Sequence, residues 1–185
     1  MDHFFHKTHT IMVKIDSTMT VKSLSDFDTL IELHSREIYS YLWRLLQDPQ
    51  DAEDTLQETF LRAFKGFPRL RENSNYRAWL YKIATNVAYT HLKYRTRHAF
   101  ATSDLTDYNA ISNSYDNQQK ELIETVLEAV NSLPHKQRTT LLLRNYQGLR
   151  FDEIGETLGC SPESARANLY QALKKLRTQF IEVKK

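Results

Sequence analysis

Apolar residues recur at intervals of three and four along most of the chain, the spacing that places side chains on one face of an α-helix. Between residues 24 and 97 this pattern predicts three helices. The first begins near Ser25, which forms a capping-box pattern with Asp28, and the second begins after Pro49, with Asp51 as its expected N-cap. The apolar stripes contain Phe27, Leu30, Ile38 and Leu45 in the first helix, and Leu56, Phe60 and Phe64 in the second.

The third predicted helix follows the polar segment 69–75, in which Ser74 or Asn75 can act as the N-cap. One of its faces is apolar over residues 76–87. The opposite face consists of Lys82, Asn86, Tyr89 and Lys93. Three helices with matching apolar stripes predict a small bundle, so the first domain is expected over residues 24–97.

Residues 98–118 lack this periodicity and carry three acidic residues with no Lys or Arg, so they are predicted to be an acidic linker. Helical spacing resumes over residues 119–182, the second expected domain. Its apolar stripes comprise Leu122, Val126, Leu127 and Val130 in the first helix, and Ala165, Leu169, Ala172, Leu173 and Leu176 in the last. Residues 1–23 are interpreted as a flexible leader. Its histidines, His3, His6 and His9, have no accompanying ligand and are not expected to bind metal.

The end of the second domain has the pattern of a helix-turn-helix motif. A helix of about two turns stops at Gly159, and Ser161 followed by Pro162 is a start signal for the next helix. In this motif the second helix enters the major groove of DNA. Its candidate contacts are Ser164, Arg166, Asn168, Gln171, Lys174 and Lys175, because Arg, Asn and Gln can pair with base edges and Lys with phosphates. The alternative is a helical hairpin with a solvated basic face. The expected fold is therefore all-α, with two small helical domains joined by a flexible linker.

The composition of the 185 residues excludes several classes of protein. A single Cys can form neither an internal disulfide nor a Cys-based zinc or iron–sulfur site, and it is typical of a reducing, cytoplasmic compartment. Four Gly leave no glycine-rich phosphate loop, and no apolar run approaches the roughly 20 residues of a membrane span. We therefore expect no cofactor, no metal, no membrane insertion and no enzymatic activity.

The net charge of +2 conceals two basic blocks. Residues 51–97 and 161–185 each carry +4, and these charges are offset by −2 over residues 1–50, −3 over 98–118 and −1 over 119–160. Separate basic blocks around an acidic stretch are typical of a protein that binds nucleic acid.

The first basic block suits single-stranded nucleic acid, because its long helix interleaves basic residues with aromatic rings on which bases can stack. The loop before the helix offers guanidinium, amide and hydroxyl groups for the edge of an unstacked base. The candidate residues are Arg71, Asn73, Ser74 and Asn75 in the loop, and Lys82, Asn86, Tyr89 and Lys93 on the helix. Taken alone, the same pattern also occurs on ordinary basic surfaces.

An acidic cluster occupies the first two turns of the second helix. It consists of Asp51, Glu53, Asp54 and Glu58, with Gln57 beside Glu58. The helix dipole accounts for acidic residues in the first turn. Glu58 lies further along, where it and Gln57 leave a surface for a basic protein partner. Nothing nearby has the pattern of a nucleophile or a metal ligand set, so a catalytic carboxylate pair is not expected.

Four separated segments read DAEDTLQETFLRAF (51–64), YRAWLYKIATN (76–86), LPHKQR (133–138) and GLRFDEIGETLGCS (148–161). Together and in this order they resemble the sigma factors of bacterial RNA polymerase, specifically the extracytoplasmic-function (ECF) group. The resemblance covers about residues 24–180. It implies a subunit that binds core polymerase, recognises the minus-ten and minus-thirty-five promoter elements and promotes strand opening.

The resemblance also implies roles for the candidate residues. It assigns Asp51, Asp54, Gln57 and Glu58 to the clamp helices of the polymerase β′ subunit. The loop 71–75 would capture a flipped base of the minus-ten element, the following helix would open the duplex, and the helix-turn-helix would read the minus-thirty-five element. Further implied partners are the β flap, promoter DNA in double- and single-stranded form, and an anti-sigma factor, with the acidic linker running near the RNA path.

Three positions depart from the family pattern. Gly155 stands where Ala is usual, Ala165 where Val is common, and Asn168 where a basic residue is frequent. The glycine costs about 0.5–1 kcal/mol in helix propensity. Two other classes of protein stay open: a stand-alone regulator that uses only the helix-turn-helix, and an adaptor of stacked helices with no DNA role. The sigma interpretation needs both the basic aromatic helix and the acidic helix, whereas a regulator needs only the C-terminal part.

Overall fold

The computed structural model describes residues 21–70, 74–102 and 117–182, and all regular structure in these ranges is helical. The elements are α2 (Val21–Leu46), α3 (Pro49–Gly66), the 3₁₀ turn η2 (Phe67–Arg69), α4 (Tyr76–Thr102), α5 (Asn117–Asn131), α6 (His135–Asn145), α7 (Phe151–Leu158) and α8 (Pro162–Glu182). The all-α expectation is confirmed for this part of the chain. The histidines of the expected leader and the centre of the expected linker, residues 103–116, lie outside the described residues.

The first two helices begin earlier than the sequence pattern predicts. α2 begins at Val21, within the expected leader, so the predicted capping box at Ser25 is wrong because the helix already runs through that residue. α3 begins at Pro49, and the prediction of Asp51 as its N-cap is also wrong. The true cap is Asp48, whose Oδ1 accepts a hydrogen bond from the backbone N–H of Asp51 at 2.8 Å. Proline suits the first helical position because its φ is already helical and it has no N–H to satisfy.

α4 begins as predicted and ends later. Asn75 is its N-cap, because the Oδ1 atom accepts a hydrogen bond from the backbone N–H of Ala78 at 3.0 Å. The helix continues to Thr102 and α5 begins at Asn117, so both enter the expected linker 98–118. Residues 98–102 contain no Gly or Pro that would stop a helix.

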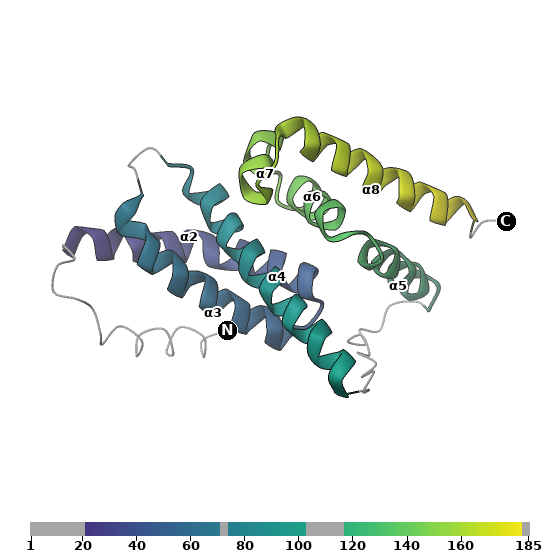
Figure 1. Cartoon of the computed structure of the whole chain (residues 1–185), viewed down its shortest axis with the longest axis horizontal. Coiled ribbons are helices and arrows are strands. Elements are labelled where there is room, and N and C mark those ends of the chain that lie inside the picture. The colour runs from purple at the N-terminus through teal and green to yellow at the C-terminus, as the bar shows by residue number, and fades with distance from the viewer. Residues whose placement is uncertain (1–20, 71–73, 103–116, 183–185) are drawn as a thin grey trace.

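α2, α3 and α4 pack into a bundle with an apolar core (Figure 1). Its buried side chains include Phe27, Leu30, Ile38, Leu42 and Leu45 from α2, Leu56 from α3, and Leu80 and Ala84 from α4. At the centre, the hydroxyl groups of Tyr41 and Thr85 are hydrogen-bonded at 2.7 Å, and the Tyr41 ring meets that of Tyr81 edge-on at 5.3 Å. This hydrogen bond allows a phenol to be fully buried.

The C-terminal helices pack directly onto this bundle, with α7 against α4 and α6 against α2 (Figure 1). Leu142, Leu143, Leu149 and Ile154 belong to the same buried cluster as the residues of α2 and α4. The free energy gained by such packing is roughly proportional to the apolar surface area removed from water. The two helical groups therefore share one core across the domain seam, the contact between α2–α4 and α6–α7.

A buried arginine crosses the domain seam. The guanidinium of Arg138 on α6 donates a hydrogen bond to the backbone carbonyl of Leu45, and it lies 3.4 Å from the carbonyl of Arg44. These carbonyls belong to the last turn of α2, where helix geometry leaves C=O groups without partners and the helix dipole favours a cation. Burial lowers the pKa of the Arg138 guanidinium. The arginine thus caps a helix of the other domain.

A second polar contact at the seam is centred on Glu37 of α2. The Nε of Arg77 donates to both carboxylate oxygens at 3.1 and 3.0 Å, and its Nη2 donates to Oε2 at 2.8 Å. His34 Nδ1 lies 2.6 Å from Oε1. Arg77 also donates to the backbone carbonyl of Gln147 at 2.6 Å, and the Gln147 side chain accepts a hydrogen bond from Tyr81 at 2.9 Å. Glu37 therefore orients the arginine that joins α4 to the loop after α6.

We expect Glu37→Gln to destabilise the protein at neutral pH and not in acid. Burial raises the pKa of Glu37, but the hydrogen bonds from His34 and Arg77 outweigh burial and hold it at about 2. Because the folded-state pKa lies below the unfolded value, the stabilisation is present above about pH 4.5 and is lost as pH falls towards 2. The carboxylate is partly solvated, so the expected loss is only about 1–2 kcal/mol.

The measurement is urea unfolding of both proteins at a series of pH values from 7 to 3. The difference in the free energy of unfolding between wild type and Glu37→Gln should shrink steadily below pH 4.5. An equal difference at pH 3 and pH 7 would show that the carboxylate charge is not responsible.

Three residues of the predicted apolar stripes in the second domain are exposed, and the expectation that Leu173 is buried is wrong. Val126 and Leu127 of α5 are 38% and 37% exposed, and Leu173 of α8 is 45% exposed. α5 packs mainly against α8, and the side chains of Val126 and Leu127 stay partly exposed to solvent. Leu173 follows the fully buried Ala172 and is rotated from it by about 100° around the axis of α8, which places it at the solvent-exposed side. The smaller core that does form contains Leu133, Leu141 and Ala172, with Val130, Leu169 and Leu176 beside it.

Candidate nucleic-acid interface

The predicted helix-turn-helix is formed by α7, the turn at residues 159–161 and α8. Gly159 has the left-handed φ of +62° that ends α7, and the Oγ of Ser161 accepts a hydrogen bond from the backbone N–H of Ser164 at 3.2 Å. Gly155 allows the backbone of the turn to pass close to α7, because glycine has no side chain. A Cβ at this position would lie 2.7 Å from the carbonyl oxygen of Cys160, so the departure from the family's alanine matches the local geometry.

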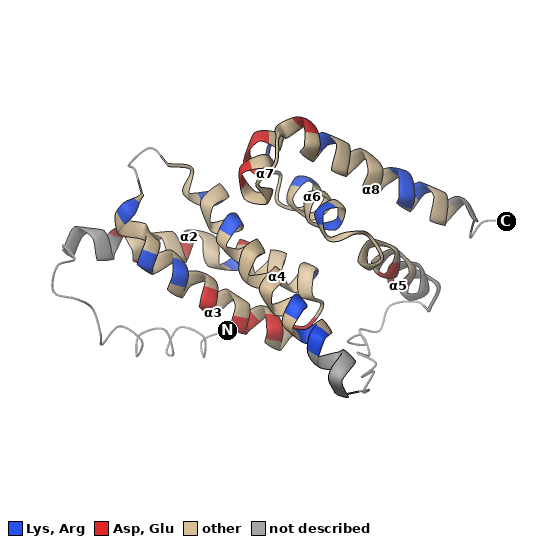
Figure 2. Ribbon diagram, viewed as in Figure 1, with Lys and Arg blue, Asp and Glu red and all other residues tan. Residues whose placement is uncertain are grey.

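The outward face of α8 carries the residues predicted to contact duplex DNA. Exposed positions are Ser164, Arg166, Gln171, Lys174 and Lys175, and Asn168 is half-buried. The guanidinium of Arg166 lies 5.1 Å from the centre of the Phe151 ring and 3.5 Å from a carboxylate oxygen of Glu163. Figure 2 shows the basic residues along α8 and the acidic residues around α7. The structure therefore places these six candidates together on one helix, and five of them are exposed.

Two further arginines, which the sequence pattern did not predict as DNA contacts, lie beside this face. Arg144 lies over the Phe151 ring at 5.0 Å, so the ring contacts both Arg144 and Arg166. Arg150 also lines the shallow hollow between α7 and α8 and is paired with Asp152 at 3.0 Å. Arg144 precedes the motif segment 148–161 and Arg150 lies within it. Both come before α8 in the sequence, so helical spacing along α8 did not reveal that they lie beside it.

Part of the polar face of α4 is exposed to solvent, and part of it contacts the second domain. Lys82, Asn86 and Lys93 are exposed, as predicted. Tyr89 is half-buried: its hydroxyl lies 2.6 Å from Thr139 Oγ1 and donates to the carbonyl of His135 at 3.1 Å, and burial raises its pKa. Tyr89 is therefore held by α6, although the sequence pattern grouped it with the free face.

The loop before α4 is also engaged by the second domain. Arg71 and Asn73 lie outside the described residues, and Ser74 is half-buried. Asn75 is exposed, and beyond capping α4 its Nδ2 donates to Glu153 Oε1 on α7 at 2.7 Å. In this arrangement the candidate minus-ten residues do not form one open surface, because the C-terminal domain holds Asn75 and Tyr89.

The acidic candidates on α3 differ in their surroundings. Asp51 is 3.0 Å from the Arg95 guanidinium and 3.5 Å from His91 Nε2, so it faces α4. The other three are more accessible. Asp54 accepts a hydrogen bond from Gln50, Gln57 is exposed, and Glu58 pairs with Arg62 at 2.6 Å. Of this set, Asp54, Gln57 and Glu58 remain a surface that a basic partner can reach.

Within residues 21–70, 74–102 and 117–182, no group of three or more His, Cys, Asp or Glu converges as a metal ion would require. In the same ranges no helix is both long and apolar enough to span a bilayer.

Two models of known protein families match this chain. Sigma-70 region 2 matches residues 30–98, and sigma-70 region 4 matches residues 123–176. The RNA polymerase sigma-H factor of Pseudomonas aeruginosa is 30% identical, with 79% of this chain and 81% of that protein covered. The ECF RNA polymerase sigma factor SigW of Bacillus subtilis is 27% identical, with 83% and 88% covered.

Two solved structures share the fold. The sigma factor RpoE of Bartonella quintana, in complex with the anti-sigma factor NepR, is 22% identical with a TM-score of 0.67, and the match covers 84% of this chain and 96% of that one. CnrH, in complex with the cytosolic domain of CnrY, is 19% identical with a TM-score of 0.62, and the match covers 84% and 88%.

Proposed function

The chain belongs to the ECF group of RNA polymerase sigma factors, and from its geometry we propose which residues carry promoter recognition. The function of the protein is to direct promoter recognition and transcription initiation. We assign residues 24–97 to the domain that binds core polymerase and the minus-ten element. The linker is proposed to lie within residues 98–118, a range that α4 and α5 enter from either side, and residues 119–182 are proposed to bind the minus-thirty-five element.

For the minus-thirty-five element, the proposal rests on the accessible face of α8. Arg166, Asn168 and Gln171 are placed to read base edges, and Ser164, Lys174 and Lys175 to bond phosphates. The ring of Phe151 supports Arg166 from one side. A guanidinium that is already oriented loses less side-chain freedom when it binds a guanine.

For the minus-ten element, the proposal assigns base capture to Arg71, Asn73, Ser74 and Asn75, and strand opening to Lys82, Asn86, Tyr89 and Lys93. Asn75 and Tyr89 would first have to leave Glu153 and Thr139. Extruding a base costs a few kcal/mol, which stacking and hydrogen bonds in a pocket can offset. Promoter opening therefore needs the second domain to move away from α4.

The observation that carries the proposal is the exposed basic face of α4 in the same chain as an accessible recognition helix. The test combines purified protein with bacterial core polymerase and a promoter library, and detects unpaired thymines by permanganate. We expect reactive thymines near the minus-ten position only when both protein and core enzyme are present. Binding to duplex DNA without core enzyme, and no strand opening with it, would identify a stand-alone regulator instead.

We further propose that Asp54, Gln57 and Glu58 contact the β′ clamp helices and that the second domain contacts the β flap. Asp51, which bonds Arg95 on α4, is left out of this contact surface. The protein would act in the cytoplasm, where core polymerase is found, with no catalytic role and no cofactor of its own. An anti-sigma factor is proposed as its inhibitory partner, because the structural neighbours RpoE and CnrH were solved in complex with NepR and CnrY.

We expect Glu58→Lys to weaken binding to core polymerase at least about tenfold, because reversing one charge in an electrostatically matched interface replaces attraction by repulsion. Folding should be unaffected, since the Glu58 side chain is 45% exposed and its ion pair among the described residues is with Arg62, one turn along the same helix. Affinity is measured by biolayer interferometry with immobilised core enzyme. Glu32→Lys, an exposed charge reversal on α2, is the matched control. Equal affinities of both variants and wild type would remove Glu58 from the polymerase surface.

A further inference from the structure

The recognition helix α8 begins with an exposed acidic residue that is not among the proposed DNA contacts. Glu163 is the second residue of α8, and its side chain is 76% exposed. We propose that Glu163 is a further specificity-determining residue of the minus-thirty-five site, and that it selects a cytosine within one base-pair step of the guanine that Arg166 reads. The inference rests on the proposed function, because it names a base that the same recognition helix reads.

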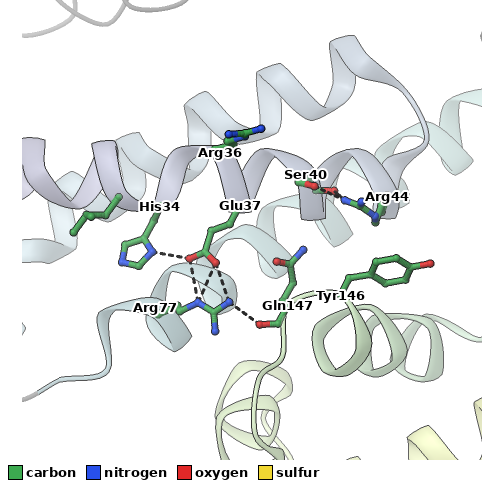
Figure 3. A pocket seen from close by; sticks show the side chains of 9 residues that line it. His34, Arg36, Glu37, Ser40, Arg44, Arg77, Tyr146 and Gln147 are labelled. Carbon is green, nitrogen blue, oxygen red and sulfur yellow. Dashed lines mark hydrogen bonds and ion pairs between the residues drawn. The ribbon is translucent and has the colours of Figure 1, made fainter.

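Carboxylates near the domain seam hold elements of the fold together. Glu37 accepts hydrogen bonds from Arg77 (Figure 3), and Glu153 accepts one from Asn75 of the other domain. The ion pair of Glu163 is instead local, since Arg166 lies one turn along the same helix and 3.5 Å away. An exposed pair of this kind contributes little to stability. The Glu163 carboxylate is therefore available to bind a ligand.

The position of Glu163 favours contact with a base. Residues in the first turns of a recognition helix reach base edges in the major groove of DNA. Phosphate groups repel a carboxylate, so a hydrogen-bond donor on a base edge is the partner that DNA offers to this side chain. The guanidinium of Arg166 lies over the ring of Phe151 at 5.1 Å, which orients it beside the carboxylate. Both members of the ion pair are thus placed at the end of α8 that enters the groove.

The ionisation of Glu163 determines which base it can bond. Hydrogen bonding to its own backbone N–H and to Ser161, together with the charge of Arg166, lowers the pKa of the Glu163 carboxyl. An ionised carboxylate only accepts hydrogen bonds. In the major groove cytosine presents its N4 donor alone, adenine presents its N6 donor beside the N7 acceptor, and guanine and thymine present acceptors. Cytosine is therefore the base that this carboxylate fits best.

The spacing of the ion pair matches neighbouring bases. Arginine commonly bonds O6 and N7 of a guanine, and this is the contact proposed for Arg166. Its Nη1 lies 3.5 Å from Oε1 of Glu163, and successive bases along a strand are about 3.4 Å apart. The two side chains can therefore contact bases in the same base pair or in adjoining pairs, which sets the limit of one base-pair step.

The test forms holoenzyme from the full-length protein and core polymerase, selects DNA from a library randomised over both promoter elements, and sequences the bound DNA. Arg166→Ala should remove a guanine preference and so locate the guanine. Glu163→Ala should reduce the cytosine preference at least about fivefold, the lower end of what a side-chain contact to a base contributes. Glu163→Gln should replace the cytosine by adenine, because an amide pairs with adenine N6 and N7.

The matched control is Glu128→Gln, which removes an exposed carboxylate from α5 and should select the same sequences as wild type. Urea unfolding of each variant separates base reading from a structural role, because a residue that only stabilised the first turn of α8 would change stability without exchanging one base for another.

Four outcomes would overturn the inference: no cytosine within one step of the guanine in the wild-type selection, cytosine retained by Glu163→Gln, a change confined to more distant positions, or the same change in Glu128→Gln. If Arg166→Ala still removes the guanine, these outcomes defeat the inference alone. Selection of no common sequence by wild-type holoenzyme would defeat the proposed function, and the inference with it.

Discussion

Replacing Lys82 and Lys93 together by alanine is expected to reduce promoter opening at least about tenfold. Both side chains are exposed on the same face of α4, and neither forms an ion pair with another described residue. Lysines in this position would bond phosphates of the separated strand. Each such contact on a single strand contributes about 0.7 to the slope of log affinity against log salt, so losing two should lower the slope by about 1.4.

The measurement is permanganate reactivity of unpaired thymines across a titration of salt, with saturating core polymerase. The matched control is Lys65→Ala with Lys136→Ala, which removes two exposed lysines from α3 and α6. The control should open promoters as wild type does, and core binding should be the same for all proteins. An unchanged salt slope in the variant would show that these lysines do not contact the strand.

The local structure of this interface could be predicted from the sequence. Gly159, Ser161 and Pro162 each have a backbone or capping preference that acts within one turn of helix, and together they define the helix-turn-helix before any tertiary contact forms. The two faces of α4 could also be predicted, because helical spacing separates Lys82 and Lys93 from the buried Leu80 and Ala84.

The packing of one domain on the other could not be predicted in the same way. Periodicity shows that Leu149 and Ile154 are buried, but it does not show that their partners lie on α2 and α4. Tyr89 shares the spacing of the exposed face, and only the position of Thr139 accounts for its burial. Asp51 was assigned to a cap from its local pattern, whereas Asp48 fills that role and Asp51 bonds Arg95.

The structural role of Arg138 could not be predicted from the sequence either, because there it is recognisable only as part of the family motif at residues 133–138. Its function in the fold depends on the end of α2, more than ninety residues earlier in the chain. A cation that is 8% exposed is costly unless its donors are satisfied. Here backbone carbonyls rather than carboxylates accept from Nη2, whereas the buried Nε has no hydrogen-bond partner among the described residues. Arg138 therefore couples the C-terminal domain to the capping of an N-terminal helix.

Arg138→Met should accordingly lower the free energy of unfolding by about 3 kcal/mol. Methionine keeps the length and apolar stem of the side chain, so the loss reports the charged hydrogen bonds and the carbonyl of Leu45 that is left without its donor. For a protein of this size such a loss corresponds to a fall in Tm of about 6–12 °C. Lys136→Met, on the exposed side of the same helix, should change stability by less than about 0.5 kcal/mol.

Urea unfolding gives the stability of both variants, and small-angle X-ray scattering distinguishes loss of folding from opening of the seam. Because Arg138 joins α6 to α2, its replacement should increase the radius of gyration before helical circular dichroism is lost. The opened form would release Tyr89 from Thr139, so promoter opening per folded molecule should be retained or raised. A destabilised variant that stays as compact as wild type would show that the shared apolar core alone holds the domains together.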